Sequence, residues 1–180
     1  MGGAESSHHG PSDRARRAVV LAAGHSTRLA GMTGGGSKAL LRVGGLSLVE
    51  RAVRRLLELG MEEVVVVVGY HAGPVAALVN QIVPGRVRAV FAEGWEEGNG
   101  ASLAAAEDAV AGETLFVLVT ADHVFGEASL EALVDAGEPA VLVDGAPEAD
   151  VLAEGTRVRV ERDRAVAFSK ALPGPAVDCG

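Results

Sequence analysis

The sequence contains little cysteine, few aromatic residues and a deficit of basic charge. Its one cysteine cannot form an internal disulfide, which favours a reducing, cytoplasmic setting. Aromatic side chains are limited to four phenylalanines, one tyrosine and one tryptophan, so a buried core must be aliphatic. The 24 acidic residues outnumber the 16 basic ones and give a net charge of −8, which argues against sequence-independent nucleic-acid binding.

Long hydrophobic runs are also missing, and no apolar stretch approaches the ~20 residues that span a bilayer. The composition is otherwise that of a globular protein, with 48% hydrophobic and 22% charged residues in a chain of 180. This length favours one domain with a substantial core. Residues 1–17 are rich in glycine, serine, histidine and arginine, so we expect a flexible tail there and a single domain over residues 18–180.

Short apolar segments alternate with amphipathic ones along most of the chain. The pattern predicts strands at residues 18–23, 64–68, 86–91 and 115–120, and helices at 48–59, 74–83, 102–110 and 129–136. Residues 140–143 are expected to be extended, and 156–160 with 165–168 to form a hairpin about Asp163. This order predicts an α/β fold: a Rossmann-like, mostly parallel sheet flanked by helices, with a small β-hairpin region near the C-terminus.

The helix over residues 48–59 carries the strongest local signals. Ser47 and Glu50 have the spacing of a capping box, and Gly60 stands where a helix-terminating glycine belongs. Ligands of such sheets bind beyond the carboxyl ends of the strands, so we expect functional residues in the loops after Ala23, Phe91 and Thr120.

The loop after the first strand, residues 24–38, is rich in glycine and contains two cations. Backbone N–H groups of a glycine-rich turn can approach a polyphosphate, and Arg28 and Lys38 would supply countercharge. The spacing fits neither a Walker loop nor a dinucleotide-binding Gly-x-Gly-x-x-Gly. A surface loop with two solvated cations is the alternative interpretation.

Residues 21–28, Leu-Ala-Ala-Gly-His-Ser-Thr-Arg, with Ser37-Lys38, resemble the signature of nucleotidyltransferases of the MobA-like NTP transferase type. These enzymes join a nucleoside triphosphate to a phosphorylated sugar or alcohol. Ser37 replaces the usual proline, and Gly34, Gly35 and Gly36 shorten the spacing, so we expect a more flexible loop than in the family.

Later segments resemble the inositol-1-phosphate cytidylyltransferases within that family. The matching segments are 67–70 (Val-Val-Gly-Tyr), 97–103 (Glu-Gly-Asn-Gly-Ala-Ser-Leu), 120–125 (Thr-Ala-Asp-His-Val-Phe), 154–158, 169–172 and 177–180. The resemblance implies transfer of a cytidylyl group from CTP to a phosphorylated alcohol or sugar, with inositol 1-phosphate as the first expectation, and release of pyrophosphate.

The resemblance also implies residue roles. Arg28 and Lys38 would be catalytic, acting on the β- and γ-phosphates. The nucleotide would be bound by Leu21, Ala22, Ala23, Gly24, Ser26, Thr27, Gly98, Asn99, Gly100 and Ser102. Asn99 and Ser102 would read the cytosine edge, although Ser102 could instead be a helix N-cap without a ligand.

Asp122 directly follows a predicted buried strand and would hold Mg²⁺, which takes one or two carboxylates with phosphate oxygens and water. Capping of the next turn is the structural alternative for Asp122, and His123 is expected to be a local hydrogen-bonding group. By resemblance, Lys170 would grip the acceptor phosphate and Asp178 would be a second metal carboxylate. Because Asp178 lies near the C-terminus, we expect it to be poorly fixed.

Other functions stay open at this point. A sugar-1-phosphate or molybdopterin-type nucleotidyltransferase is one alternative, and a non-catalytic nucleotide-binding regulatory homologue is another. In the family this domain is sometimes coupled to a membrane CDP-alcohol phosphatidyltransferase. We also expect the 180 residues to be an N-terminal piece of a longer polypeptide.

Overall fold

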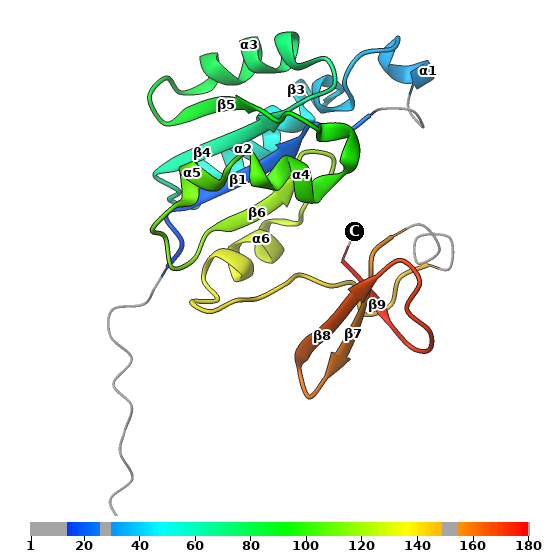
Figure 1. Ribbon diagram of the computed structural model, residues 1–180. Helices are drawn as coiled ribbons and strands as arrows, with labels where there is room; N and C mark the ends of the chain where they lie inside the picture. Colours follow the sequence, from blue (N-terminus) through cyan, green and yellow to red (C-terminus); the bar gives the residue numbers. More distant parts are fainter. Residues whose placement is uncertain (1–13, 26–29, 149–154, 180) are drawn as a thin grey trace, which may run out of the picture. The chain divides into compact units, whose positions relative to one another are not determined.

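The computed structural model describes residues 14–25, 30–148 and 155–179, and it divides into two compact units, 1–138 and 139–180 (Figure 1). The strands described after residue 139 pair among themselves in a sheet of their own. The single domain expected over residues 18–180 stays a prediction. Most of the expected N-terminal tail, residues 1–13, lies outside the described residues.

A parallel four-stranded sheet forms the centre of the first unit and confirms the predicted α/β fold. Its strands are β1 (Arg17–Ala22), β4 (Glu63–Val68), β5 (Val87–Phe91) and β6 (Val117–Thr120), in the order β5-β4-β1-β6. All three pairings are parallel. The inner strands β1 and β4 are buried on both faces, which explains why they read as continuous apolar runs rather than alternating ones.

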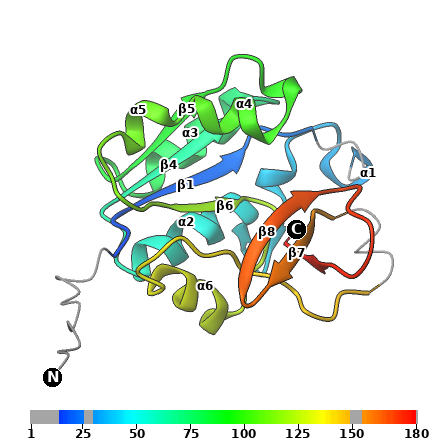
Figure 2. The ribbon, with the colours of Figure 1, turned by 60° about the horizontal axis from the view of Figure 1, so that its bottom comes forward.

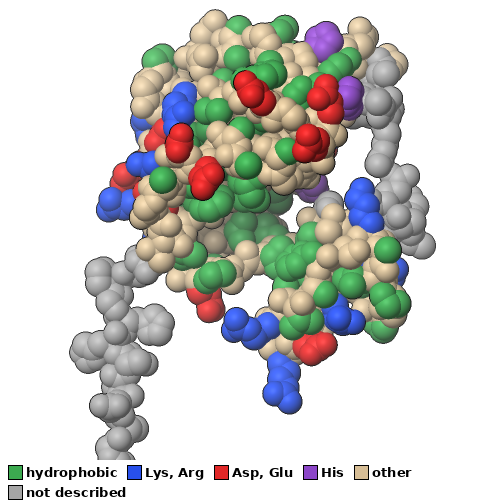
Figure 3. Space-filling view, viewed as in Figure 1, with side chains coloured by type: hydrophobic (Ala, Val, Ile, Leu, Met, Phe, Trp, Pro, Cys, Tyr) green, Lys and Arg blue, Asp and Glu red, His purple; other side chains and the backbone are tan. Residues whose placement is uncertain are grey.

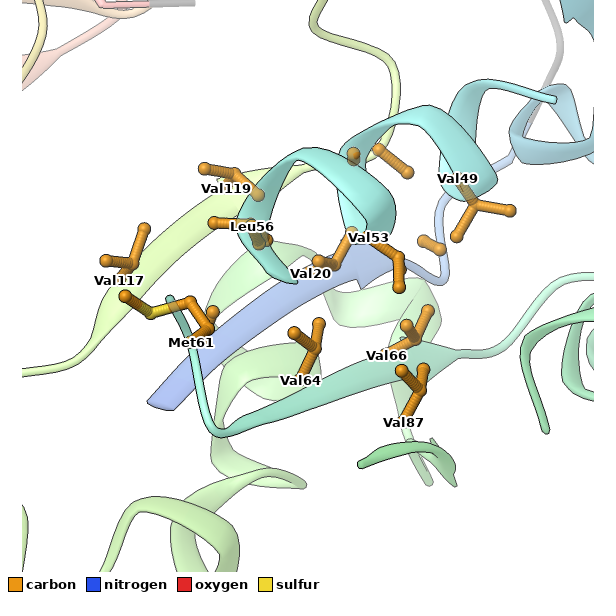
Figure 4. Packing of buried hydrophobic residues seen from close by; sticks show 14 of the residues in the cluster. Val20, Val49, Val53, Leu56, Met61, Val64, Val66, Val87, Val117 and Val119 are labelled. Carbon is orange, nitrogen blue, oxygen red and sulfur yellow. The ribbon is translucent and has the colours of Figure 1, made fainter. Parts of the chain in front are cut away.

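Helices cover both faces of this sheet. One face carries α2 (Leu48–Glu58), α3 (Ala72–Ile82) and α6 (Glu127–Val134), and the other carries α4 (Asn99–Ala104) and α5 (Glu107–Val110) (Figure 2). On the first face, Val53 and Leu56 of α2 pack against valines of β1, β4 and β6 (Figure 4). The core is aliphatic, as the small number of aromatic residues requires.

The predicted signals at both ends of α2 are confirmed in large part. The Ser47 hydroxyl caps the helix by accepting the Glu50 N–H at 3.2 Å. The Glu50 carboxylate pairs with Arg54 instead of completing the capping box. At the other end Gly60 has φ 93°, and its N–H and that of buried Met61 bond back to the last turn, as in a Schellman motif.

Several predicted boundaries are wrong. The helix expected over 102–110 is two short helices, and the break between them brings both Ala106 and Ala109 against the sheet. The helix α3 begins two residues before Pro74. Residues 140–143 form no strand; only Asp144 makes an isolated bridge. The small elements α1 (Ala30–Thr33), η2 (Lys38–Leu40), β2 (Arg42–Val43), β3 (Leu46–Ser47) and η3 (Trp95–Glu97) were not expected.

The first described residues contact the helices and the sheet of the first unit. Arg14 donates to the Leu59 carbonyl at 3.0 Å and pairs with Asp135 at 3.0 Å. Arg17 begins β1 and pairs with Glu113 at 3.1 Å. The ordered unit therefore starts earlier than residue 18.

The second unit is a small antiparallel sheet in the order β8-β7-β9, made of β7 (Arg157–Glu161), β8 (Arg164–Ser169) and β9 (Val177–Asp178). The predicted hairpin about Asp163 is confirmed: Arg162 and Asp163 form its turn with φ of 48° and 62°. In neither unit is a described helix long and apolar enough to cross a membrane.

Candidate active site

The loops after β1, β4 and β6 begin side by side at one edge of the first unit's sheet. The Tyr70 N–H donates to the Ala23 carbonyl and the Ala121 N–H to the Leu21 carbonyl, both at 2.9 Å, so the strands stay in register where the loops start. Because carboxyl ends of parallel strands are where α/β proteins bind ligands, this edge is the candidate site.

Lys38 and Asp122 meet at this edge. Lys38 Nζ lies 2.5 Å from Asp122 Oδ2, with about a third of each side chain exposed. Lys38 comes from the glycine-rich segment after β1, and Asp122 follows β6. The structure thus brings together two residues that the sequence analysis assigns to phosphate and metal binding.

The surroundings of Asp122 keep its carboxylate ionised. His123 Nδ1 lies 3.5 Å from Asp122 Oδ1 and also bonds to the Thr120 hydroxyl, which confirms His123 as a local hydrogen-bonding group. The hydrogen bond from His123, together with the bond and charge of Lys38, holds the pKa of Asp122 well below its usual range, although partial burial acts in the opposite direction. Asp122 is therefore a charged oxygen donor at neutral pH.

Ser37 holds Lys38 in place. The sequence analysis expects a looser loop because Ser37 stands where the family has proline. In the structure Ser37 is 2% exposed and caps η2, with its hydroxyl accepting the Ala39 N–H at 3.3 Å. Ala39 is buried in the core beside α2. A hydrogen-bonded cap and a core contact thus stand where proline would restrict the backbone, and the expectation of a more flexible loop stays a prediction.

The expected nucleotide-binding residues fall into three groups. Leu21, Ala22 and Ala23 are buried in and just after β1, and Gly24 is exposed at the start of the loop. The second group, Ser26 and Thr27, lies outside the described residues, as does the catalytic candidate Arg28.

The third group surrounds the start of α4. Gly98, with φ 115°, is the helix N-cap, and Asn99 and Gly100 are exposed in the first turn. Ser102 is 3% exposed and its N–H bonds to the Gly98 carbonyl at 3.1 Å. The alternative of Ser102 as N-cap is therefore wrong, because Gly98 occupies that position.

A cluster of rings at the same edge was missed by sequence reasoning. His25, which follows β1, lies 4.8 Å from Tyr70 and 4.5 Å from Trp95, measured between ring centroids. His71 packs edge-on against Tyr70 at 4.5 Å. The available signal was that the chain's one tyrosine and one tryptophan both stand just after predicted strands.

Acidic side chains gather on the face of the first unit that carries α4 and α5 (Figure 3). The exposed members there are Glu93, Glu96, Glu97, Glu107 and Asp108. This charge repels a polyphosphate, so the cations at the edge of the sheet must supply the local attraction.

Two expected residues belong to the second unit. Lys170 is exposed just after β8. Asp178 is 6% exposed in β9, exchanges backbone hydrogen bonds with Asp144 at 2.8 and 3.2 Å, and packs its carboxylate against Gly155. The expectation that Asp178 is poorly fixed is therefore wrong. Burial and the charge of Asp178 raise the pKa of the neighbouring Cys179 thiol.

The donor chemistry at Asp122 fits a magnesium ion that a nucleotide would help to bind. Within the described ranges no three His, Cys, Asp or Glu residues come together as a metal site. Magnesium needs only one or two carboxylates when phosphate oxygens and water complete its shell, and Asp122 is an ionised oxygen ligand at the expected edge.

Comparison with known proteins assigns the chain to a family. A model of the MobA-like NTP transferase domain matches residues 18–163, so the chain belongs to this family of nucleotidyltransferase domains. This confirms the resemblance noted in the sequence and supports enzymatic activity.

Two similar proteins are each named "Bifunctional IPC transferase and DIPP synthase". The protein from Rubrobacter xylanophilus is 40% identical over 159 residues, covering 87% of this chain and 35% of the relative. That from Archaeoglobus fulgidus is 35% identical over 156 residues, covering 87% and 30%. The chain thus spans about a third of the length of these relatives.

Solved structures show the same fold. The inositol-1-phosphate CTP transferase from T. maritima aligns with a TM-score of 0.69 and 26% identity, over 93% of this chain and 69% of that one. A UDP-glucose pyrophosphorylase from Acinetobacter baumannii aligns with a TM-score of 0.67 and 17% identity over 92% and 72%, which bears on the fold alone.

Proposed function

We propose that this chain is a magnesium-dependent cytidylyltransferase that uses CTP and a phosphorylated alcohol, inositol 1-phosphate first, to form a CDP-alcohol and pyrophosphate. The observation that carries the proposal is the pairing of Lys38 with an ionised Asp122 at the carboxyl edge of the sheet. The names of the relatives, IPC transferase and inositol-1-phosphate CTP transferase, support the choice of nucleotide and acceptor.

The reaction needs no general base. An oxygen of the acceptor phosphate forms a bond to the α-phosphorus of CTP, and the bond from that phosphorus to the β-bridging oxygen breaks, so pyrophosphate leaves with the electron pair. The acceptor is already an anion at neutral pH, since the second pKa of a phosphate monoester is about 6. Such transfers depend on positioning and charge stabilisation, which this edge of the sheet provides.

Lys38 and Asp122 have complementary roles in this scheme. Lys38 supplies positive charge to the β- and γ-phosphates and to the departing pyrophosphate, with Arg28 assigned the same task by resemblance. Asp122 holds the magnesium ion. When bound, that ion neutralises charge on the phosphate oxygens. In the ligand-free protein the Lys38 ammonium balances the Asp122 carboxylate.

The segment around α4 is assigned to the base. Asn99 is exposed in the first turn of α4 and Ser102, three residues further on, is buried; both side chains carry groups that hydrogen-bond to a cytosine edge. In the second unit, resemblance assigns Lys170 to the acceptor phosphate and Asp178 to a second metal ligand. The relatives' names join an IPC transferase to a DIPP synthase, which supports a coupling of this chain to a second, synthase activity.

The test is to incubate the protein with Mg²⁺, each of the four nucleoside triphosphates in turn, and inositol 1-phosphate, glucose 1-phosphate or no acceptor, and to measure pyrophosphate and product mass. We expect pyrophosphate and CDP-inositol only with CTP and inositol 1-phosphate. Activity with glucose 1-phosphate and another triphosphate would favour a sugar-phosphate nucleotidyltransferase. Nucleotide binding without any pyrophosphate release would favour a regulatory homologue.

A further inference from the structure

Tyr70 connects the turn after β4 to the glycine-rich segment that carries Lys38. Its hydroxyl donates to the Gly35 carbonyl at 2.7 Å, across 35 positions of sequence. Its ring lies 4.8 Å from His25 and 5.9 Å from Trp95. One side chain thus links loops that follow β1, β4 and β5.

The glycine-rich segment that Tyr70 contacts has high intrinsic backbone freedom. Gly34 and Gly35 have φ of 58° and 83°, and glycine loses more backbone freedom on ordering than any other residue. The Gly36 N–H closes a turn on Thr33 at 3.0 Å. On the other side of Lys38, Ala39 is buried in the core. Lys38 therefore stands between a core anchor and the glycines that Tyr70 binds.

The ring cluster lies largely outside the aliphatic core, although Trp95 packs against one side of it. The described core is aliphatic, and Tyr70 and Trp95 are only half-buried while His25 is exposed. Trp95 is packed directly over Gly69, where a Cβ would come within 2.4 Å of its Cγ. The rings therefore form a platform built at the functional edge of the sheet.

We propose that Tyr70 is a positioning residue, whose hydroxyl bond to Gly35 and ring contacts hold the glycine-rich segment so that Lys38 is presented beside Asp122. This deepens the proposed function and rests on it, because the presented group is the one assigned to the triphosphate. Loss of the tie lowers the fraction of molecules with the segment in place. The apparent affinity for nucleotide falls by that fraction, whereas the bound nucleotide restores the arrangement.

The experiment compares Tyr70→Phe, which keeps the ring and removes the hydroxyl, with Tyr70→Leu, which removes both. Thr114→Val serves as the control, since it removes an exposed hydroxyl at the opposite, amino end of β6. Amide hydrogen exchange is measured without ligand in peptides covering residues 33–41 and, for reference, α2. Trp95 is the chain's one tryptophan, so its fluorescence reports on the cluster.

In Tyr70→Phe we expect exchange in residues 33–41 to quicken by about threefold to tenfold, the effect of one neutral hydrogen bond, with α2 and the Trp95 emission unchanged. The KM for CTP should rise by a smaller factor than the exchange rate, because it depends on the fraction of molecules with the segment in place, while kcat changes less than twofold. Tyr70→Leu should show a larger rise in KM and a shifted Trp95 emission. Thr114→Val should change none of these.

Unchanged exchange in residues 33–41 of both Tyr70 variants would overturn the proposal, and so would a loss of kcat with an unchanged KM. The exchange measurement needs no substrate. A wild-type protein that turns over no CTP would therefore contradict the proposed function, while the exchange data would still decide whether Tyr70 holds the segment.

Discussion

Lys38 Nζ lies 2.5 Å from Asp122 Oδ2, although the two residues are 84 positions apart and follow different strands. Each side chain is about one third exposed, and ion pairs of this kind contribute only ~0–1 kcal/mol to stability. The pair is therefore a poor explanation of why the unit folds. It is a good place to test function, since replacing either partner should cost little stability.

Replacing Asp122 by asparagine should abolish most turnover. The change keeps the size of the side chain and removes the charge that would hold magnesium, so we expect kcat to fall at least about a hundredfold, the effect of losing several kcal/mol of charge stabilisation. Steady-state pyrophosphate release measures this loss, and thermal unfolding followed by circular dichroism measures the fold.

Asp108→Asn on the exposed surface of α5 is the matched control for Asp122→Asn and should keep full activity. Wild-type turnover in Asp122→Asn, or undiminished activity of the wild-type protein in excess chelator, would exclude the metal role.

The pH dependence should be set by the acceptor rather than by Asp122. Because the pKa of Asp122 is held below its usual range, the carboxylate stays charged through the acidic range in which enzymes are usually assayed. We expect the rate to fall below about pH 6, where a phosphate monoester gains its second proton. His123→Gln should show the same fall in rate below about pH 6. If the midpoint of that fall moved by a full pH unit in this variant, the titrating group would belong to the protein and not to the acceptor.

The lowered pKa of Asp122 also predicts how the stability of the protein changes with pH. A carboxyl whose folded pKa is lowered contributes stability that is present above its unfolded value, about 3.9, and is lost as the pH falls towards the folded value. Lys38→Met removes part of the cause of the shift. Urea unfolding should therefore show Lys38→Met less stable than wild type at pH 7, with the difference shrinking at pH 3. A difference that grows on acidification would contradict this assignment.

The helices and strands that were predicted correctly are those marked by neighbouring residues in the sequence. The valines of β4 and the cap at Ser47 fix their elements within a few residues, because continuous apolar runs and N-cap hydroxyls act over short distances. The break between α4 and α5 was not predictable, since it depends on which alanines reach the sheet. The β9 strand is only two residues long and exists through its partner β7.

The site was predictable where a charged residue follows a strand, as Asp122 does, and where resemblance supplied the pattern around Lys38. The tie from Tyr70 to Gly35 was not, because a side-chain bond to a backbone carbonyl has no sequence signature. Ser37 shows the opposite case. Serine in place of proline predicts a looser loop. The Ser37 hydroxyl nevertheless caps the following helix, which is a local restraint that the residue type alone does not reveal.

Discrimination between bases should depend on α4. CTP and UTP differ by an amine donor and a carbonyl acceptor at one ring position, and sites built on such hydrogen bonds reject the wrong partner because buried polar groups are left unpaired. Ser102→Ala should lower the ratio of kcat/KM for CTP to that for UTP by about tenfold. Ser129→Ala, on the exposed surface of α6, is the control. Equal rates with all four triphosphates in the wild type would remove any base-reading role.

The close approach of Trp95 to the backbone gives the last prediction. A Cβ at Gly69 would lie 2.4 Å from Trp95 Cγ and 2.9 Å from the Ala23 carbonyl oxygen. Gly69→Ala must therefore push Trp95 away from the sheet, and overpacking of this kind typically costs about 1–3 kcal/mol. We expect a lower urea midpoint, a red-shifted Trp95 emission as the indole becomes wetter, and weaker CTP binding.

Gly73→Ala is the matched control, since a Cβ there meets nothing within 4 Å and the residue lies in the first turn of α3. Alanine is the better helix former, by about 0.5–1 kcal/mol, so this variant should be as stable as the wild type or more so, with unchanged emission. If Gly69→Ala matched Gly73→Ala in urea midpoint and Trp95 emission, Trp95 would not be packed on Gly69. The ring cluster would then not be held against the sheet by this contact.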